Sequence, residues 1–259
     1  MKLGLSGKSA LLMSSTRGLG FGCAKALTAE GVSVVINGRD QARGIDAASE
    51  LGDAAKFIAA DVTKEQDRQS LHEIATEHLG AIDILITNCD GPSPGSFLGK
   101  TIEEWRQAFD HVAIPSIDMV HRCVPSMTER RFGRVVNISS ISAKETTLGA
   151  PLANGLRPVL LGAFGTLARE IGASGVTINN ILAGPFDTDV VRRVAAHAIG
   201  QPDLTPEEAT KIYAQKGPMK RLGTIEEFGA LCAFLSSDLA GYITGQSFVI
   251  DGGHVPSLY

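Results

Sequence analysis

The sequence predicts a doubly wound α/β protein, in which a parallel β-sheet carries helices on both faces. Short apolar runs rich in β-branched residues alternate with amphipathic helical stretches along the chain. These runs are apolar almost throughout, which is typical of parallel strands that are buried on both sides. A turn of small residues also joins the first run to the first helical stretch, as expected where a helix N-terminus receives a phosphate. We therefore expect a three-layer sandwich.

Seven of the apolar runs are expected to be strands, and helices are expected to fill the intervals between them. The strands are predicted at Ser9–Met13, Ser33–Asn37, Lys56–Ala60, Ile82–Thr87, Arg134–Ile138, Thr177–Leu182 and Ser247–Ile250. Glycine, proline, asparagine and aspartate gather at the breaks, where turn chemistry favours them. No break is long enough to be a domain linker, so a single domain over residues 1–259 is predicted.

The segment 189–220 departs from this alternation. It contains Gly200, Pro202, Pro206 and Pro218 and follows the end of a predicted strand. Ligands of doubly wound proteins bind beyond the carboxyl ends of the strands. We therefore expect an irregular helical insertion that acts as a mobile substrate lid.

Composition narrows the classes of partner. The net charge is −4 and the basic residues are scattered, which argues against a nucleic-acid-binding protein and favours a small-molecule substrate. No apolar stretch of about 18 residues and no cleavable leader is apparent, so neither a membrane span nor export is expected. The cysteines are far apart and form no CxxC pair, which argues against zinc and disulfides and predicts a reducing cytoplasm; they are Cys23, Cys89, Cys123 and Cys232.

The turn after the first strand has the character of a dinucleotide site. Gly18 and Gly20 are in the register of a glycine-rich phosphate turn, although Ser14 stands where a first glycine is usual. Arg17 lies in this turn, and Arg39 follows the second strand, where a carboxylate would be expected in a pocket for NAD. Because guanidinium groups suit a 2′-phosphate, NADP(H) is predicted. Asp40 would weaken that preference, and both arginines are alternatively solvated surface residues.

Several ordered motifs resemble those of the short-chain dehydrogenase/reductase superfamily, in the layout of its 3-oxoacyl-carrier-protein reductase type. The resemblance covers nearly the whole chain. The matching pieces are Ser14–Gly20, Asp61–Val62, Asn88–Gly91, Asn137–Ser140, Asn180 with Gly184–Thr188, Thr244–Gln246 and Asp251–Gly253. The resemblance implies a Rossmann-type fold that binds a nicotinamide coenzyme.

The resemblance also implies where that coenzyme would lie. Its phosphates would be held by the turn and by Arg39, and its adenine would be flanked by Asp61 and Val62. Asn88 would line the cofactor at the end of the fourth strand, and Gly184–Thr188 would hold the nicotinamide carboxamide. The implied cofactor-binding residues are Ser14, Thr16, Arg17, Gly18, Leu19, Gly20, Arg39, Asp61, Val62, Asn88, Cys89, Gly184, Phe186 and Thr188. Asp61, Val62, Asn88 and Gly184–Thr188 are alternatively plain strand-end structure. The segment 241–259 looks like the subunit contact of a homotetramer, or else a simple edge strand.

The catalytic motif of the superfamily is only partly present. The family uses a serine, a tyrosine thirteen residues later, a lysine four residues after that, and an asparagine on an earlier helix. Ser140 matches the serine, but the other positions hold Ala153, Arg157 and Val112. The motif is not displaced either, since no tyrosine is followed four residues later by lysine. Ser140 and Arg157 remain as candidate catalytic residues.

Three residues are candidates for the missing acid. Lys144, in the loop after the fifth predicted strand, would act if desolvation lowered its pKa; alternatively it is a surface lysine paired with Glu145. His111 would relay protons, and Tyr213 would bring a phenol from the lid. Asn154 and Arg157 would alternatively bind a carboxylate or oxyanion without redox chemistry.

These observations together predict an NADP(H)-dependent oxidoreductase that acts on a carbonyl or alcohol through an atypical active site. Two alternatives stay open on the same fold. One is a non-redox enzyme, such as a dehydratase, isomerase or lyase, and the other is a non-catalytic nucleotide-binding protein. Substrate selectivity is expected to lie in residues 92–100 and 189–220.

Overall fold

A single parallel sheet forms the centre of the computed structural model, which describes residues 2–201 and 203–256. The strand order is β3-β2-β1-β4-β5-β6-β7, and every neighbouring pair is parallel. The strands are β1 (Ser9–Leu12), β2 (Ser33–Gly38), β3 (Ala55–Ala59), β4 (Ile84–Thr87), β5 (Gly133–Ser140), β6 (Val176–Ala183) and β7 (Ser247–Ile250). All seven predicted strands are confirmed, and their ends move by no more than two residues.

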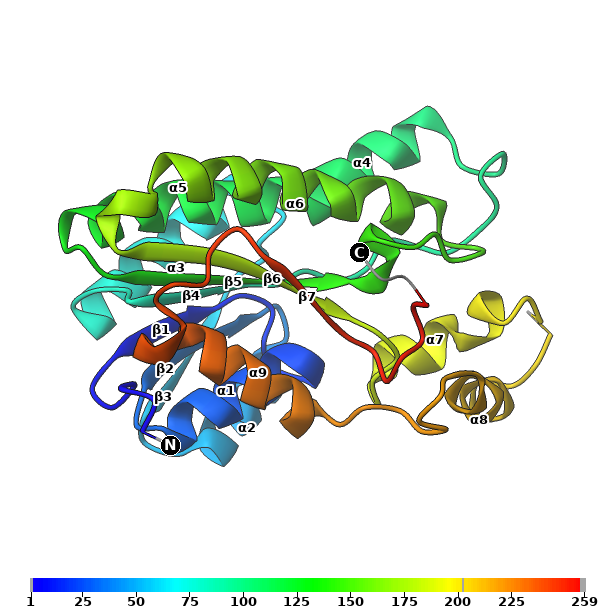
Figure 1. Cartoon of the computed structure of the whole chain (residues 1–259), viewed down its shortest axis with the longest axis horizontal. Helices are drawn as coiled ribbons and strands as arrows, with labels where there is room; N and C mark the ends of the chain where they lie inside the picture. The colour runs from blue at the N-terminus through cyan, green and yellow to red at the C-terminus, as the bar shows by residue number, and fades with distance from the viewer. Residues whose placement is uncertain (1, 202, 257–259) are drawn as a thin grey trace.

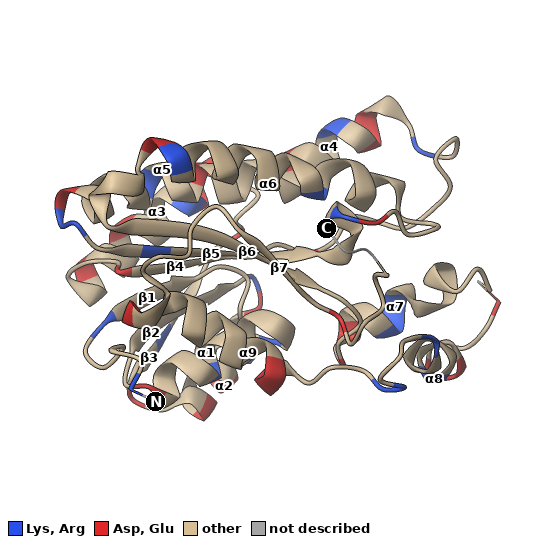
Figure 2. Cartoon of the chain, in the orientation of Figure 1, with Lys and Arg blue, Asp and Glu red and all other residues tan. Residues whose placement is uncertain are grey.

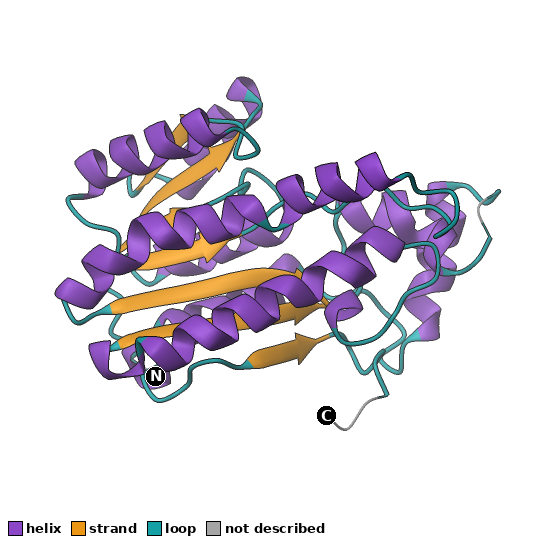
Figure 3. Ribbon diagram, turned by 90° about the horizontal axis from the view of Figure 1, so that it is seen from above, coloured by secondary structure: helices purple, strands orange, loops and turns teal. Residues whose placement is uncertain are grey.

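Helices cover both faces of this sheet, as Figures 1 and 3 show. One layer consists of α1 (Gly18–Ala29), α2 (Gln41–Leu51) and α9 (Ile225–Ser236). The opposite layer consists of α3 (Glu65–Leu79), α4 (Ile102–Val112), α5 (Ile114–Glu129) and α6 (Pro151–Glu170). Three 3-10 turns complete these layers: η1 (Ile141–Ala143), η2 (Gly172–Ser174) and η3 (Asp238–Ala240). The doubly wound, three-layer architecture is confirmed.

Strand β1 explains why the predicted strands are apolar throughout. Ala10 and Leu12 belong to the apolar cluster under α1 and α9, whereas Leu11 and Met13 belong to the cluster under α3, α5 and α6. Successive side chains of a strand point to opposite faces, and here each face carries a hydrophobic core. A polar residue on either face would therefore lie in a core.

A polar ladder crosses the carboxyl half of the sheet. The Oγ1 atom of Thr87 donates to Asn137, whose amide donates to Asn180, whose amide in turn donates to Ser247. The four residues are register partners on β4, β5, β6 and β7. These bonds satisfy buried polar side chains and fix the strand register close to the ends from which the functional loops leave.

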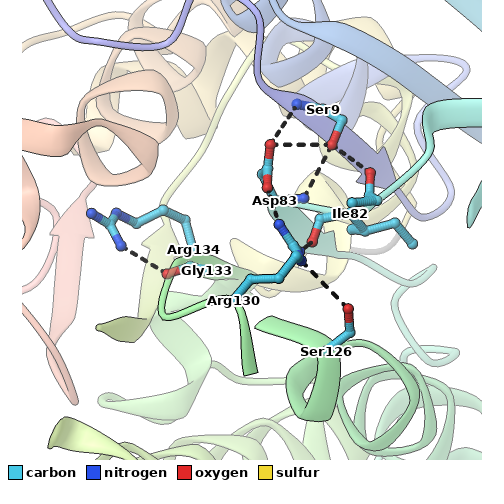
Figure 4. Close-up of polar contacts among 8 residues, drawn as sticks. Ser9, Ile82, Asp83, Ser126, Arg130, Gly133 and Arg134 are labelled. Carbon is cyan, nitrogen blue, oxygen red and sulfur yellow. Dashed lines mark hydrogen bonds and ion pairs between the residues drawn. The ribbon is translucent and has the colours of Figure 1, made fainter. Parts of the chain in front are cut away.

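The opposite, amino-terminal edge of the sheet is held by a second polar cluster, drawn in Figure 4. The amide of Asp83 donates to Ser9 Oγ at 3.2 Å, and the Ser9 amide donates to the Asp83 carboxylate at 3.3 Å. Arg130 at the end of α5 pairs with the same carboxylate and donates to Ile82 O at 2.7 Å. The cluster ties β1, the residues preceding β4 and α5 together at the edge remote from the functional loops.

The segment 189–220 is helical as expected, but it forms two regular helices rather than an irregular insertion. They are α7 (Asp189–Ala198) and α8 (Pro206–Lys216), which lie beyond the carboxyl ends of the strands at the right of Figure 1. Thr205 and Glu208 form a capping box at the start of α8, where Pro206 occupies the first turn. Pro202 lies outside the described residues.

Charged residues of both signs occur throughout the fold, and the cysteines are unpaired. Lys and Arg are interspersed with Asp and Glu over the elements (Figure 2). No helix within residues 2–201 and 203–256 is long and apolar enough to cross a membrane. The four cysteines are buried free thiols.

Candidate functional site

Two adjoining cavities lie where the loops leave the carboxyl ends of the strands. The larger has a volume of about 680 Å³ and lies against the ends of β1, β2 and β3. The smaller has a volume of about 460 Å³ and lies between the β1–α1 turn, the end of β5, α6 and α7. Ser14, Arg17 and the segment 89–92 line both. They therefore form one cleft, and each volume is within the range of small-molecule sites, about 300–1,000 Å³.

The β1–α1 turn leaves the first helix open to an anion. Helix α1 begins at Gly18 with no side chain capping its first N–H groups. Gly18 has φ +59, a conformation that favours glycine. Gly20 lines neither cavity. A Cβ at Gly20 would lie 2.9 Å from Ser15 Cα, so the glycine allows α1 to pack closely against the turn. A pyrophosphate group fits this turn.

Ser14 adopts the backbone that a first glycine would adopt. Its φ is +47, and both of its peptide groups are held by side chains. Its amide donates to Asn37 Oδ1 at 3.2 Å, and its carbonyl accepts from Asn88 Nδ2 at 2.9 Å. These two bonds offset the strain of a left-handed serine, on the order of 1–3 kcal/mol. Asn88 thus shapes the turn as well as lining the smaller cavity.

The two arginines expected at a 2′-phosphate both line the larger cavity, and each already has a carboxylate partner. Arg39 lies 3.1 Å from Asp90, and Arg17 lies 2.8 Å from Asp189 at the start of α7. Both pairs are substantially exposed, so each is weak and open to exchange for a phosphate. Asp40 lines the larger cavity too, and its side chain caps α2 by accepting from the Arg43 amide.

Asp61 and Val62 line the larger cavity as expected, together with Thr16. Burial opposes ionisation of Asp61, but hydrogen bonds from Thr63 and the charge of Arg39 outweigh it, so the pKa of Asp61 lies below its ordinary value. The carboxylate is therefore charged at neutral pH. Its negative charge faces the same cavity as Arg39.

The catalytic positions named by the resemblance come together in the smaller cavity. Ser140, at the end of β5, lines it with Ala153 and Arg157, which lie one helical turn apart on α6. The Oγ atom of Ser140 accepts from the Ser142 amide at 3.2 Å, which leaves the hydroxyl proton available to a ligand. Val112 is fully buried and lines the larger cavity instead.

Arg157 is the most unusual side chain of this group. Only 7 % of the residue is exposed. Its Nη1 atom donates to Ile138 O at 3.4 Å and lies 3.6 Å from Cys89 Sγ, while its Nε atom is buried without a partner among the described residues. Cys89, which lines both cavities, also donates to the carbonyl of Val112.

The other candidate acids and bases fall in different places. Lys144 is exposed and lines neither cavity, so the expectation of a desolvated lysine in the cleft was wrong: it points out of the η1 turn into solvent. His111 is exposed at the larger cavity, away from Ser140. Asn154 does not face the cleft as expected, because its amide is used to bond the backbone of Thr147. Tyr213 of α8 does line the smaller cavity.

Gly184–Thr188, the segment expected at the nicotinamide, also lines the smaller cavity, as does Leu19. Gly184 is required by packing, since a Cβ there would lie 2.6 Å from Asp251 Cα. Phe186 is only 3 % exposed and its ring packs edge-on against Phe228 at 5.4 Å. Its contribution to the cleft therefore comes mainly from the backbone. Thr188 precedes α7 and approaches Gly18 across the cavity.

Ser142 and His197 are among the residues of the smaller cavity that sequence reasoning did not name. The hydroxyl of Ser142 is buried without a partner in the described part of the chain. Its position two residues beyond Ser140 was the only available signal. His197 is carried to the cavity by α7, whose regular course was not expected.

Comparison with known proteins agrees with this geometry. A family model described as Enoyl-(Acyl carrier protein) reductase matches residues 13–254. The chain is 28% identical to the NADPH-dependent reductase BacG of Bacillus subtilis, covering 98% of this chain and 100% of the other. It is 31% identical to the 3-oxoacyl-[acyl-carrier-protein] reductase FabG of Haemophilus influenzae, covering 96% and 98%.

Among solved structures, the L-sorbose reductase of Gluconobacter frateurii, described as complexed with NADPH and L-sorbose, superposes with a TM-score of 0.92. The two are 25% identical, and all of each chain is covered. The match to the family model over residues 13–254, with relatives that align over nearly the whole chain, shows that this protein belongs to the short-chain dehydrogenase/reductase superfamily.

Proposed function

We propose that this protein is an NADP(H)-dependent oxidoreductase that reduces a carbonyl compound to an alcohol. The observation that carries the proposal is the continuous cleft in which a glycine-bearing phosphate turn opens toward Ser140 and Arg157. The NADPH named in the descriptions of two similar reductases supports the choice of coenzyme.

The chain's own residues fit the coenzyme. The uncapped N-terminus of α1 and the close packing at Gly20 suit a pyrophosphate. Arg39 and Arg17, both at the larger cavity, suit the 2′-phosphate because a guanidinium makes paired hydrogen bonds to phosphate oxygens. When bound, NADPH supplies the hydride that is added to the carbonyl carbon.

Ser140 and Arg157 are the proposed catalytic residues. The hydroxyl of Ser140 accepts from the Ser142 amide, so it is oriented to donate its proton toward a carbonyl oxygen. Arg157 holds a fixed positive charge at the same cavity, which favours the negative charge that develops on that oxygen. Lys144 has no part in this proposal, because its side chain is exposed.

The proton that completes the reduction must come from a residue other than Ala153, which has none to give. Tyr213 is the phenol at this cavity. Burial raises the pKa of Tyr213, so the phenol is protonated at neutral pH but is a weaker acid than an ordinary tyrosine, and its case as donor rests on its place at the cavity. We propose it as the proton donor, delivered by α8.

Isotope transfer tests the proposed function. NADPH deuterated at C4 would be incubated with oxo acids and neutral ketones, and the products analysed by mass spectrometry. The wild type is expected to place deuterium on the carbinol carbon, and Ser140→Ala to lower the rate on the order of 10²-fold or more. Lys144→Gln is expected to retain the wild-type rate. NADPH that binds tightly while no compound in the panel acquires deuterium would contradict the proposal.

We also propose a cytoplasmic homotetramer. The reduced state of the four buried cysteines supports the location.

Strand β7 pairs only with β6 and leaves one edge of the described sheet free, with Leu239 exposed nearby in sequence, which supports a subunit contact in the segment 241–259. Residues 257–259 of that segment lie outside the described residues. Light scattering tests the assembly, and a monomeric mass would contradict it.

A further inference from the structure

Arg157 differs from the other cations of the smaller cavity in having no acidic partner. Arg17 and Arg192 line the same cavity, and both are paired with carboxylates, Arg17 with Asp189 and Arg192 with Asp187 and Asp189. Within residues 2–201 and 203–256, no carboxylate lies within ion-pair distance of Arg157.

Burial makes the missing partner significant. Only 7 % of Arg157 is exposed, and a guanidinium group keeps its positive charge in proteins. A buried charge without a counter-charge is unfavourable by several kcal/mol. The neutral carbonyl of Ile138 and the thiol of Cys89 are its partners, at 3.4 and 3.6 Å, and neither balances the charge.

Two further polar side chains at this cavity are unsatisfied. The hydroxyls of Ser139 and Ser142 are buried without hydrogen-bond partners among the residues that the structure describes, and both residues line the cavity that Arg157 lines. Buried polar groups are nearly always paired with protein, water or ligand. A guanidinium and two hydroxyls that line one cavity are donors of the kind that an oxyanion requires.

If the coenzyme binds as proposed above, it does not supply an anion to Arg157. Its phosphates then lie at the N-terminus of α1 and near Arg39, where the chain offers other donors. The nicotinamide and its ribose carry no negative charge. The remaining source is the substrate, and the apolar residues that also line the cavity, including Ile141, Leu148 and Val194, suit an apolar remainder.

We propose that the substrate carries a carboxylate, which Arg157 binds by an ion pair beside the carbon that is reduced. The inference rests on the proposed function and names its substrate class: oxo carboxylic acids with an apolar body. Arg157 is then the residue that selects acids over neutral ketones and esters.

Calorimetry on the protein saturated with NADP⁺ tests this without turnover. The probes are 2-oxo-4-phenylbutanoate and 2-oxohexanoate, each compared with its ethyl ester. We expect each acid to bind the wild type at least about tenfold more tightly than its ester, which corresponds to about 1.4 kcal/mol. Arg157→Gln is expected to remove this preference, and Arg157→Lys to keep part of it. Arg192→Gln is the matched control, because it removes a paired cation from the same cavity and should retain the preference.

The alternative outcomes are distinct. Equal affinity for acid and ester in the wild type, or no binding of either acid at millimolar concentration, overturns the proposal and leaves the reductase standing. A preference for acid over ester that survives in Arg157→Gln also overturns the proposal. If that variant binds NADP⁺ more weakly as well, Arg157 is assigned to the coenzyme. If the wild type binds no NADP⁺, the proposed function fails, and the same titrations on the free protein decide whether Arg157 binds carboxylates.

Discussion

Arg39 is the residue that we expect to determine the preference for NADPH over NADH. It reaches the larger cavity from the end of β2, and its exposed pairing with Asp90 is weak enough to be exchanged for a phosphate. The neighbouring Asp40 lines the same cavity, where its charge opposes a 2′-phosphate, but it caps α2 and is paired with Arg43.

Replacing Arg39 by Asp should therefore change coenzyme preference. Loss of charge-assisted bonds to the 2′-phosphate is expected to weaken NADPH binding by about 10- to 100-fold, with a much smaller change for NADH, which lacks that group. Titration of nicotinamide fluorescence measures both constants. Equal weakening of NADPH and NADH would remove the assignment of Arg39.

The proposed role of Tyr213 as proton donor leads to a second prediction. Tyr213→Phe should lower kcat on the order of 10²-fold with little change in KM, because a positioned acid acts in the transition state. The control is Tyr242→Phe, which removes the same oxygen from a fully exposed side chain. An unchanged kcat for Tyr213→Phe would show that the proton comes from another source.

At the scale of elements, helices α1 and α7 are joined across the cleft by one ion pair. Arg17 immediately precedes α1, and Asp189 opens α7. The carboxylate of Asp189 lies beside the helix N-terminus that is proposed to receive the pyrophosphate. A bound anion and Asp189 therefore compete for Arg17.

Asp189→Asn should consequently bind NADPH more tightly than the wild type. Exposed ion pairs are worth about 0.2–1 kcal/mol, so an increase in affinity of roughly two- to fivefold is expected. The matched control is Asp187→Asn, which removes a carboxylate that pairs only with Arg192 among the described residues. Weaker NADPH binding by Asp189→Asn, or the same gain in Asp187→Asn, would contradict the competition.

The elements themselves were largely predictable, and the reasons are visible in the structure. Strands such as β1 feed two cores at once, so their sequence is apolar at every position and easily recognised. The regular helices of 189–220 were not foreseen because glycine and prolines read as interruptions. In the structure Pro206 starts α8 and Pro218 follows its end, positions where proline is compatible with a helix.

At the scale of the whole molecule, paired carboxylates should limit stability in acid. Burial opposes ionisation of Asp118, but hydrogen bonds from Arg68 and Arg122 outweigh it and lower its pKa. A hydrogen bond from Arg221, with others from Thr224, lowers the pKa of Glu227 to about 2. A folded-state pKa below the unfolded value means that the stabilisation is present above the unfolded pKa and is lost as pH falls.

Urea unfolding should therefore show a falling midpoint as pH drops from about 4.5 toward 2, the interval between the ordinary and the lowered pKa of Glu227. Glu227→Gln should reduce the slope of that fall. A midpoint that is flat through this interval in the wild type would contradict the assignment of these ion pairs.

The sequence predicted only those parts of the cleft that come from short, continuous stretches of the chain. The turn at Ser14–Gly20 and the spacing from Ser140 to Ala153 and Arg157 lie within short stretches, and the structure brings them to one cleft. The contact of Cys89 with Arg157 joins residues 68 positions apart, and the lack of an acidic partner for Arg157 depends on every neighbouring element. Neither has a local signal in the sequence.

The functional interpretation of this protein depends on a nicotinamide coenzyme with a 2′-phosphate binding in this cleft. Calorimetric titration of the wild-type protein with NADPH and with NADH tests it most directly. Saturable binding of both is expected, with NADPH the tighter because Arg17 and Arg39 lie at the same cavity. No heat of binding for either coenzyme would contradict the account.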